Sequence, residues 1–233
     1  MINLVNSTVR TKISGSSLAF NYVSILGGKI TKMSDVDHDG LYRLAESQAG
    51  YFTARQAVES GMDRSTLRHH ARPGGRYERV RRGLFRLRHF PSSPHEHVMA
   101  AWLPLREAGA VVSHESALEM LDLSDVIPSA VHLTLPRSER GQRRRDGVQL
   151  HFPSNNPAKK EIQQVQGLPV TSPERTFVDA LKDGTQPEQI EMAISQSLER
   201  GTTTPRRLRA AATSSSERAR RFVELNLKAG SES

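Results

Sequence analysis

The sequence predicts an α+β fold, with an N-terminal winged helix-turn-helix followed by a mixed helical domain with a small sheet. Short amphipathic segments, separated by glycines and helix-capping residues, fill the stretch 38–72 and indicate a small group of helices. Two short strand-like runs over 77–87 indicate a hairpin. Beyond Pro91 and Pro94, helical periodicity alternates with the strand-like segments VHLTLP and VQLHF, which indicates a second, mixed domain.

The domain boundaries are predicted at changes of composition. Residues 1–34 contain no acidic residue and little periodicity, so we expect a disordered arm, or an extension upstream of an alternative start at Met33. The winged helix-turn-helix is predicted over 35–91 and the α+β domain over 92–212. A last helix and a tail are predicted over 213–233.

The first two helices are predicted from periodicity and caps. In the first, Leu41, Leu44 and Ala45 share one face. In the second, Thr53 followed by Gln56 has the spacing of a capping box. Ala57 and Val58 are expected to face inward, and Gly61 is expected to end this helix.

The third helix is expected to start after Asp63, its cap, and to run to about Ala71, with a break at Pro73-Gly74-Gly75. Met62 and Leu67 lie at the positions of a hydrophobic staple, and Ala71 is expected to face the core with Leu67. Two short helices joined by Gly-Met-Asp have the length and turn chemistry of a helix-turn-helix.

The hairpin supplies the wing. Strands are expected over 77–80 and 84–87, joined by Arg81-Arg82-Gly83, with Gly83 free to take a positive φ. Val80 and the apolar residues of 84–87 are expected to face the core.

The second domain is predicted to begin with a helix whose cap is Ser93, with Pro94 at its first position and Glu96 at its third. Trp102 follows at helical spacing and is expected in the core. Ser113 and Ser172 are interpreted as helix caps. Further helices are expected from Pro173, Pro187 and Pro205 onward, where proline suits the first helical position; all three starts lie in the C-terminal half of the chain.

The net charge favours a polyanion as partner. The formal charge is +8 and the pI about 10.2, a balance typical of proteins that bind nucleic acid, although a merely soluble basic surface would give the same numbers. The chain has no cysteine, which excludes disulfides, thiolate nucleophiles and cysteine-based zinc sites.

The cations concentrate on the two elements that contact DNA in a winged helix. In the third helix, arginines at 64, 68 and 72 are four residues apart and form one ridge, and a major groove admits one helix. The residues expected to read bases are Arg64, Ser65, Arg68 and His69, with Thr66 suited to a base or a phosphate. Those expected to hold the DNA backbone are Arg72, Arg76, Arg79, Arg81 and Arg82.

Other readings of these charges remain open at this point. The winged helix could present a solvated basic face to an acidic protein. A second basic cluster, at 137–145, is interpreted as a solvated loop, and a third, at 206–221, as solvated helical faces.

No catalytic, metal or cofactor site is predicted. The sequence has no nucleophile elbow, P-loop or GxGxxG, and no acidic pairing typical of a metal-dependent nuclease. His95-Glu96-His97 resembles a ligand cluster, but neighbouring helical residues point about 100° apart. His114-Glu115 with Asp122 and Asp125 is likewise not interpreted as an acid–base or metal site.

Over residues 38–212, the chain resembles the AbiEi-type antitoxins. The resemblance is carried by the QA-x-x-x-G helix, the R-x-x-L helix, the RRG hairpin, the SHESAL helix and the LPVTSPERT segment. Each motif is weak alone, and together they are fairly specific. The similarity is greatest to mycobacterial antitoxins paired with nucleotidyltransferase-like toxins.

The resemblance implies a non-enzymatic transcriptional repressor of its own operon, and the absence of cysteine fits a cytoplasmic location. It also implies two partners, double-stranded operator DNA and a cognate toxin encoded by the adjacent gene. By position, the DNA-contacting helix would be 64–72 and the wing 76–88, while antitoxicity would belong to the C-terminal half. A stand-alone winged-helix transcription factor and a DNA-targeted nuclease are the alternatives.

Overall fold

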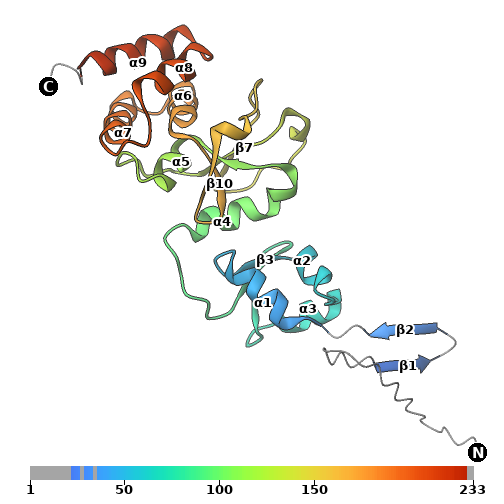
Figure 1. Cartoon of the computed structure of the whole chain (residues 1–233). Helices are drawn as coiled ribbons and strands as arrows, with labels where there is room; N and C mark the ends of the chain where they lie inside the picture. Colours follow the sequence, from blue (N-terminus) through green and yellow to red (C-terminus); the bar gives the residue numbers. More distant parts are fainter. Residues whose placement is uncertain (1–21, 27–28, 34–35, 230–233) are drawn as a thin grey trace, which may run out of the picture.

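A computed structural model of the chain describes residues 22–26, 29–33 and 36–229. It has the predicted α+β fold, with a winged helix at one end, a five-stranded sheet in the middle and a group of helices at the other end (Figure 1). None of the helices within these ranges combines the length and the apolar character that crossing a bilayer requires.

The winged helix contains three helices and a three-stranded sheet. The helices are α1 (His38–Glu46), α2 (Ala54–Glu59) and α3 (Arg64–His70). The strands are β3 (Tyr51–Thr53), β4 (Tyr77–Arg81) and β5 (Leu84–Leu87), in the order β3-β5-β4 with antiparallel pairing throughout. Leu41, Phe52, Met62 and Leu67 form the centre of its core, each at most 3% exposed.

The capping signals predicted for α2 and α3 are confirmed. Thr53 Oγ1 accepts a hydrogen bond from the Gln56 N–H, and Gln56 Oε1 accepts one from the Thr53 N–H. The carboxylate of Asp63 accepts the N–H groups of Ser65 and Thr66. Each cap satisfies donors that the first turn of a helix leaves without an intrahelical partner.

Several local predictions for this domain are wrong. Val58 is 49% exposed and Val80 44% exposed, so neither belongs to the core. Helix α3 ends at His70, with Ala71 as its C-cap, and Arg72 therefore lies in the following turn. Strand β3 was not expected, because three residues are too few to show an alternating pattern.

The predicted arm lies largely outside the described residues. In its described part, β1 (Tyr22–Leu26) and β2 (Lys29–Met33) form an antiparallel pair in which Ile25 is opposite Ile30. The boundary at residue 34 stays a prediction, as do those at 91 and 212.

The sheet of the second domain has the order β8-β7-β6-β10-β9. Its strands are β6 (Val111–Val112), β7 (Val131–Thr134), β8 (Val148–His151), β9 (Ile162–Val165) and β10 (Leu168–Thr171). Strands β7 and β8 run parallel, as do β6 and β10, while the remaining neighbours are antiparallel. Strand β9, which the sequence analysis did not identify, forms one edge.

Helices enclose this sheet and extend beyond it. Helix α4 (Glu96–Trp102) leads into the 3₁₀ segment η1 (Leu103–Ala108), and α5 (His114–Met120) follows β6. The C-terminal group comprises α6 (Pro173–Asp183), α7 (Pro187–Glu199), α8 (Pro205–Thr213) and α9 (Glu217–Ala229). Two further 3₁₀ segments are η2 (Arg137–Glu139) and η3 (Lys159–Glu161).

The helix-start predictions for this domain are only partly correct. Pro173, Pro187 and Pro205 do begin helices, and Ser172 caps α6 by accepting the Arg175 N–H. The predicted start at Ser93 is wrong, because α4 begins at Glu96 with His95 as its N-cap. Even so, the Glu96 carboxylate accepts a hydrogen bond from the Ser93 N–H at 3.3 Å. This half of the expected capping box therefore forms, although the helix itself begins only at Glu96.

The two domains share a polar and an apolar contact. Arg86 of β5 donates to Glu96 of α4 at 2.9 Å, with the Arg86 side chain 14% exposed. Tyr51 and Leu84 of the winged helix pack into the same core cluster as Trp102 and Leu105. Trp102 is buried, as predicted, and its indole N–H donates to the Ala110 carbonyl.

Candidate nucleic-acid interface

Helix α3 is held at both ends of its first turn. Leu67 packs into the core of the winged helix at 3% exposed, and the Asp63 carboxylate binds two backbone N–H groups at 2.7 and 2.8 Å. These hydrogen bonds, with those from the Ser65 and Thr66 side chains, lower the pKa of Asp63 to about 2. Asp63 is therefore ionised at neutral pH, and it fixes the direction of the helix that carries the candidate residues.

The base-reading candidates lie on the surface of α3. Arg64, Ser65, Arg68 and His69 are exposed, and Thr66 is half-buried. The hydroxyls of Ser65 and Thr66 donate to Asp63, at 2.7 and 3.0 Å. Since a phosphate or a base acceptor would need those same hydrogens, Ser65 and Thr66 serve the cap in this conformation, and the arginines are left as the free donors.

The backbone-holding candidates lie on the turn after α3 and on the wing. Arg72, Arg76, Arg79 and Arg82 are all exposed. Arg82 occupies the tip of the hairpin beside Gly83, whose φ of +78° favours glycine and whose missing side chain faces open space. The tip can thus approach a phosphate backbone without steric hindrance.

Arg81 departs from the predicted role. It is the last residue of β4 and pairs with Leu84, so the turn contains Arg82 and Gly83 only. Its guanidinium donates to the carbonyl oxygen of Ala100 in the second domain, and burial lowers its pKa. The placement of Arg81 at an exposed wing tip is therefore wrong, and this side chain joins the wing to α4.

Two more wing arginines have structural contacts. Arg86 is paired with Glu96, as described above, and lies 5.6 Å from the ring centre of Tyr51. Arg88 donates to the carbonyls of Gly75 and Tyr77 at 2.6 and 3.3 Å. These side chains stabilise the hairpin and its junctions, and they are not free to bind a ligand.

What remains is a set of exposed guanidinium groups on α3, its following turn and the wing. Within the described residues none of them forms an ion pair, and we call them the wing–helix arginines: Arg64, Arg68, Arg72, Arg76, Arg79 and Arg82. Arg68 makes one contact with its own helix, from Nε to the Arg64 carbonyl at 3.2 Å. Unpaired guanidinium groups on a helix and a hairpin can bind phosphates and guanine edges.

Histidines near α3 have a packing role. His70 is half-buried, with its ring 5.6 Å from that of Tyr77 and 5.7 Å from that of His38. Burial lowers the pKa of His70, and the neighbouring histidine and arginine charges lower it further. His69 is exposed, so of the two adjacent histidines only His69 remains a candidate for DNA contact.

The sequence analysis missed a polar cluster in the second domain. Ser113 precedes α5 as predicted but makes no capping bond; its Oγ contacts His114 Nδ1 at 2.9 Å and accepts from Thr134 at 2.8 Å. His114 lies with His132 and His151, while Glu115 and Asp122 point to other partners, Thr185 and Arg200. The cluster could have been found only by predicting that β7 pairs with β8, and no local sequence pattern indicates that pairing.

Comparisons with known proteins bear on the winged helix and on the fold. Residues 41–88 match the family model described as "Transcriptional regulator, AbiEi antitoxin". The fold is similar to the crystal structure of the RV2827C protein from Mycobacterium tuberculosis, with a TM-score of 0.53 and 18% identity, over 82% of this chain and 75% of that one. A search of curated protein sequences returned no match.

Proposed function

We propose that this chain represses its own operon and counteracts a cognate toxin, because residues 41–88 match the family model of the AbiEi antitoxin transcriptional regulators. In this proposal the winged helix binds operator DNA upstream of the gene, and the second domain acts on the toxin. The toxin is proposed to be a nucleotidyltransferase-like protein encoded next to this gene. With these partners, the protein is proposed to act in the cytoplasm.

The observation that carries the DNA-binding part is the set of unpaired wing–helix arginines. An exposed arginine with an acidic partner has its charge largely neutralised, whereas each of these arginines can exchange water and counterions for a phosphate. Arg64 and Arg68 lie on the first turns of α3, the part of a recognition helix that reaches base edges. Arginine reads guanine through parallel bonds to O6 and N7.

No catalytic activity is proposed for either domain. In the second domain, the carboxylates of Asp179 and Glu161 both pair with Arg175, at 2.6 and 3.5 Å. The function therefore rests on binding to DNA and to protein.

The DNA-binding part is tested with a fragment covering the sequence upstream of the gene. We expect a discrete complex in a gel shift, and an Arg68→Ala variant that binds roughly 5- to 150-fold more weakly, with the loss confined to one base position. Arg206→Ala is the matched control, since Arg206 is equally exposed on α8 and forms no ion pair among the described residues. Equal operator affinity of Arg68→Ala and wild type would contradict the assignment of α3.

The antitoxin part is tested by co-expressing this chain with the product of the adjacent gene. We expect the wild-type chain to restore growth, and we expect Arg68→Ala to do so too, because neutralisation is assigned to the second domain. Failure to restore growth would contradict the antitoxin role and leave a stand-alone transcription factor. Metal-dependent cleavage of the operator fragment would instead support a DNA-targeted nuclease.

A further inference from the structure

Two buried histidines and one half-buried histidine, from three separate elements, meet in the second domain. His114 begins α5, His132 lies on β7 and His151 ends β8. In the parallel register of β7 and β8, His132 pairs with Gln149, so His151 is two residues further along and on the same face. One nitrogen from each ring lies within 4.8 Å of one from each of the others.

The ring contacts within this cluster are close. Nδ1 of His132 lies 3.1 Å from Nε2 of His151, and the rings of His114 and His151 stack with centroids 3.6 Å apart. Two facing imidazole nitrogens either share one hydrogen or direct two lone pairs at one cation. Their separation is close to that between two nitrogen ligands of a tetrahedral zinc ion, about 3.4 Å for zinc–nitrogen bonds of about 2.1 Å.

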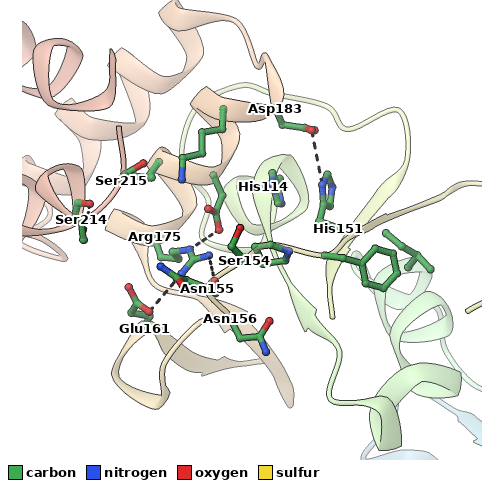
Figure 2. Close-up of a pocket in the computed structure, with 17 residues that line it drawn as sticks. His114, His151, Ser154, Asn155, Asn156, Glu161, Arg175, Asp183, Ser214 and Ser215 are labelled. Carbon is green, nitrogen blue, oxygen red and sulfur yellow. Dashed lines mark hydrogen bonds and ion pairs between the residues drawn. The ribbon is translucent and has the colours of Figure 1, made fainter. Parts of the chain in front are cut away.

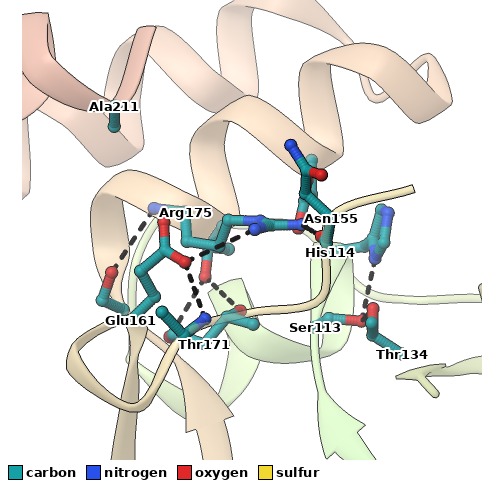
Figure 3. A network of polar contacts seen from close by, with 12 residues as sticks. Ser113, His114, Thr134, Asn155, Glu161, Thr171, Arg175 and Ala211 are labelled. Atoms are coloured by element: carbon teal, nitrogen blue, oxygen red, sulfur yellow. Dashed lines mark hydrogen bonds and ion pairs between the residues drawn. The ribbon is translucent and has the colours of Figure 1, made fainter. Parts of the chain in front are cut away.

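Polar groups lie behind two of the rings. The carboxylate of Asp183 lies 3.8 Å from His151 Nδ1, on the side of that ring away from His132 (Figure 2). It also lies 3.7 Å from His132 Nδ1, the nitrogen that faces His151. Ser113 contacts His114 Nδ1 and is itself held by Thr134 (Figure 3). A carboxylate behind His151 and a hydroxyl behind His114 resemble the arrangement that orients histidine ligands around metals.

The cluster opens on one side to a cavity of about 730 Å³. His114 and His151 line it together with Arg175 and Lys182 from α6 and with the segment Ser154–Asn156 (Figure 2). Arg175 is anchored by Asp179, Glu161 and the Asn155 carbonyl, so it forms a fixed wall (Figure 3). A position beside the histidines and facing this cavity is accessible to water or to a small ligand.

The surroundings favour a neutral cluster. His114 and His132 are 7% and 5% exposed, and burying a charged imidazole away from water is unfavourable. Neutral imidazoles offer lone pairs, and nitrogen ligands suit zinc and its neighbours rather than magnesium or calcium. Lone pairs lie in the ring planes, so the stacked rings of His114 and His151 must rotate relative to each other before both can bind one ion.

We propose that His114, His132 and His151 bind one divalent transition-metal ion of the zinc type, with Asp183 orienting the His151 ring and a fourth position open to the cavity. This departs from the sequence-based expectation of no metal site. It also goes beyond the proposed function, because it concerns a site far along the chain from α3 and the wing. A failure to find the metal would leave the DNA-binding proposal untouched.

The site is tested on the full chain without a histidine tag, after chelator treatment and dialysis. Titration with Zn²⁺, followed by elemental analysis, should give one bound equivalent, and Co²⁺ should give a visible spectrum typical of tetrahedral nitrogen ligation. His114→Asn and His151→Gln should each lower the affinity at least tenfold, and Asp183→Asn about 10- to 100-fold. His89→Ala and His97→Ala are matched controls at exposed histidines and should bind as wild type.

A second measurement covers the case in which a variant does not fold. X-ray absorption of the zinc-loaded wild-type chain counts imidazole ligands directly, and three are expected. Two or fewer imidazoles, less than half an equivalent of tightly bound Zn²⁺, or equal affinity in the folded His151→Gln variant and the wild type would each overturn the proposal.

Discussion

The arginines of the winged helix and those of the C-terminal helices look alike in the sequence and differ in the structure. The wing–helix arginines have no acidic partner among the described residues. In the C-terminal group, Arg207 pairs with Glu174, Arg209 with Glu224 and Arg220 with Glu217, at 2.9, 2.8 and 2.7 Å. The other three arginines of that cluster, Arg206, Arg218 and Arg221, are exposed and form no ion pair among the described residues. Half of the C-terminal cluster is therefore neutralised within the fold, whereas none of the wing–helix arginines is.

The difference also changes what each set contributes to stability. Glu174 is buried and accepts hydrogen bonds from Thr203 at 2.5 Å and from Arg207, so its pair with Arg207 joins α6 to α8. Arg209–Glu224 and Arg220–Glu217 are exposed and worth at most about 1 kcal/mol each. The wing–helix arginines make no such contacts, so their removal should affect binding and leave the fold intact.

The largest expected effect comes from the residue that anchors the arginine-bearing helix. Leu67→Ala removes a side chain that is 3% exposed in the winged-helix core and should cost about 2–5 kcal/mol of unfolding free energy. Chemical denaturation measures this loss. Val80→Ala is the control, because Val80 is 44% exposed and its truncation should change stability by less than about 0.5 kcal/mol. Similar losses in both variants would contradict the placement of the core.

A smaller loss of stability is expected at Glu174, the buried partner of Arg207. Glu174→Ala leaves Thr203 without its acceptor and Arg207 without its partner, and we expect a cost of about 1–3 kcal/mol. Operator affinity should stay within twofold of wild type, since the winged helix is unchanged. If chemical denaturation shows no loss of stability, the claim that the paired arginines contribute to the fold would be contradicted.

The smallest effect concerns acid stability at the start of α3. The pKa of Asp63 is lowered to about 2 in the folded chain, below its ordinary value of 3.8, so the ionised carboxylate stabilises the fold above about pH 4. This contribution should be lost as the pH falls from about 4 to about 2. Asp63→Asn keeps a side chain that can cap the helix but does not titrate, so circular dichroism should show a shallower acid dependence. An unchanged acid transition would show that ionisation of Asp63 does not contribute to the stability of the fold.

Much of the winged helix could be predicted because its signals are local. Thr53 with Gln56, and Asp63 before α3, act within four residues, and the backbone donors that they satisfy belong to the same turn. The short strands β3 and β9 could not be predicted, since their partners β5 and β10 define them.

The candidate interface was predictable in outline and wrong in detail for the same reason. Spacing along α3 indicates which arginines lie on its surface, but whether a guanidinium finds a partner depends on distant residues. Arg81 contacts Ala100, nineteen positions away, and Arg86 contacts Glu96. The histidine cluster could not be predicted at all from local patterns, because it depends on the register of the parallel strands β7 and β8.

The most direct test of the account compares the salt dependence of operator binding in two double variants. Arg72→Ala with Arg79→Ala removes two wing–helix arginines, and Arg209→Ala with Arg220→Ala removes two neutralised ones. For the first pair, the log–log slope of affinity against salt should become shallower by about 1.8, as expected for two lost phosphate contacts. For the second pair the slope should match that of wild type. Equal slopes in the two variants would contradict the claim that the unpaired arginines of α3, its following turn and the wing form the DNA surface.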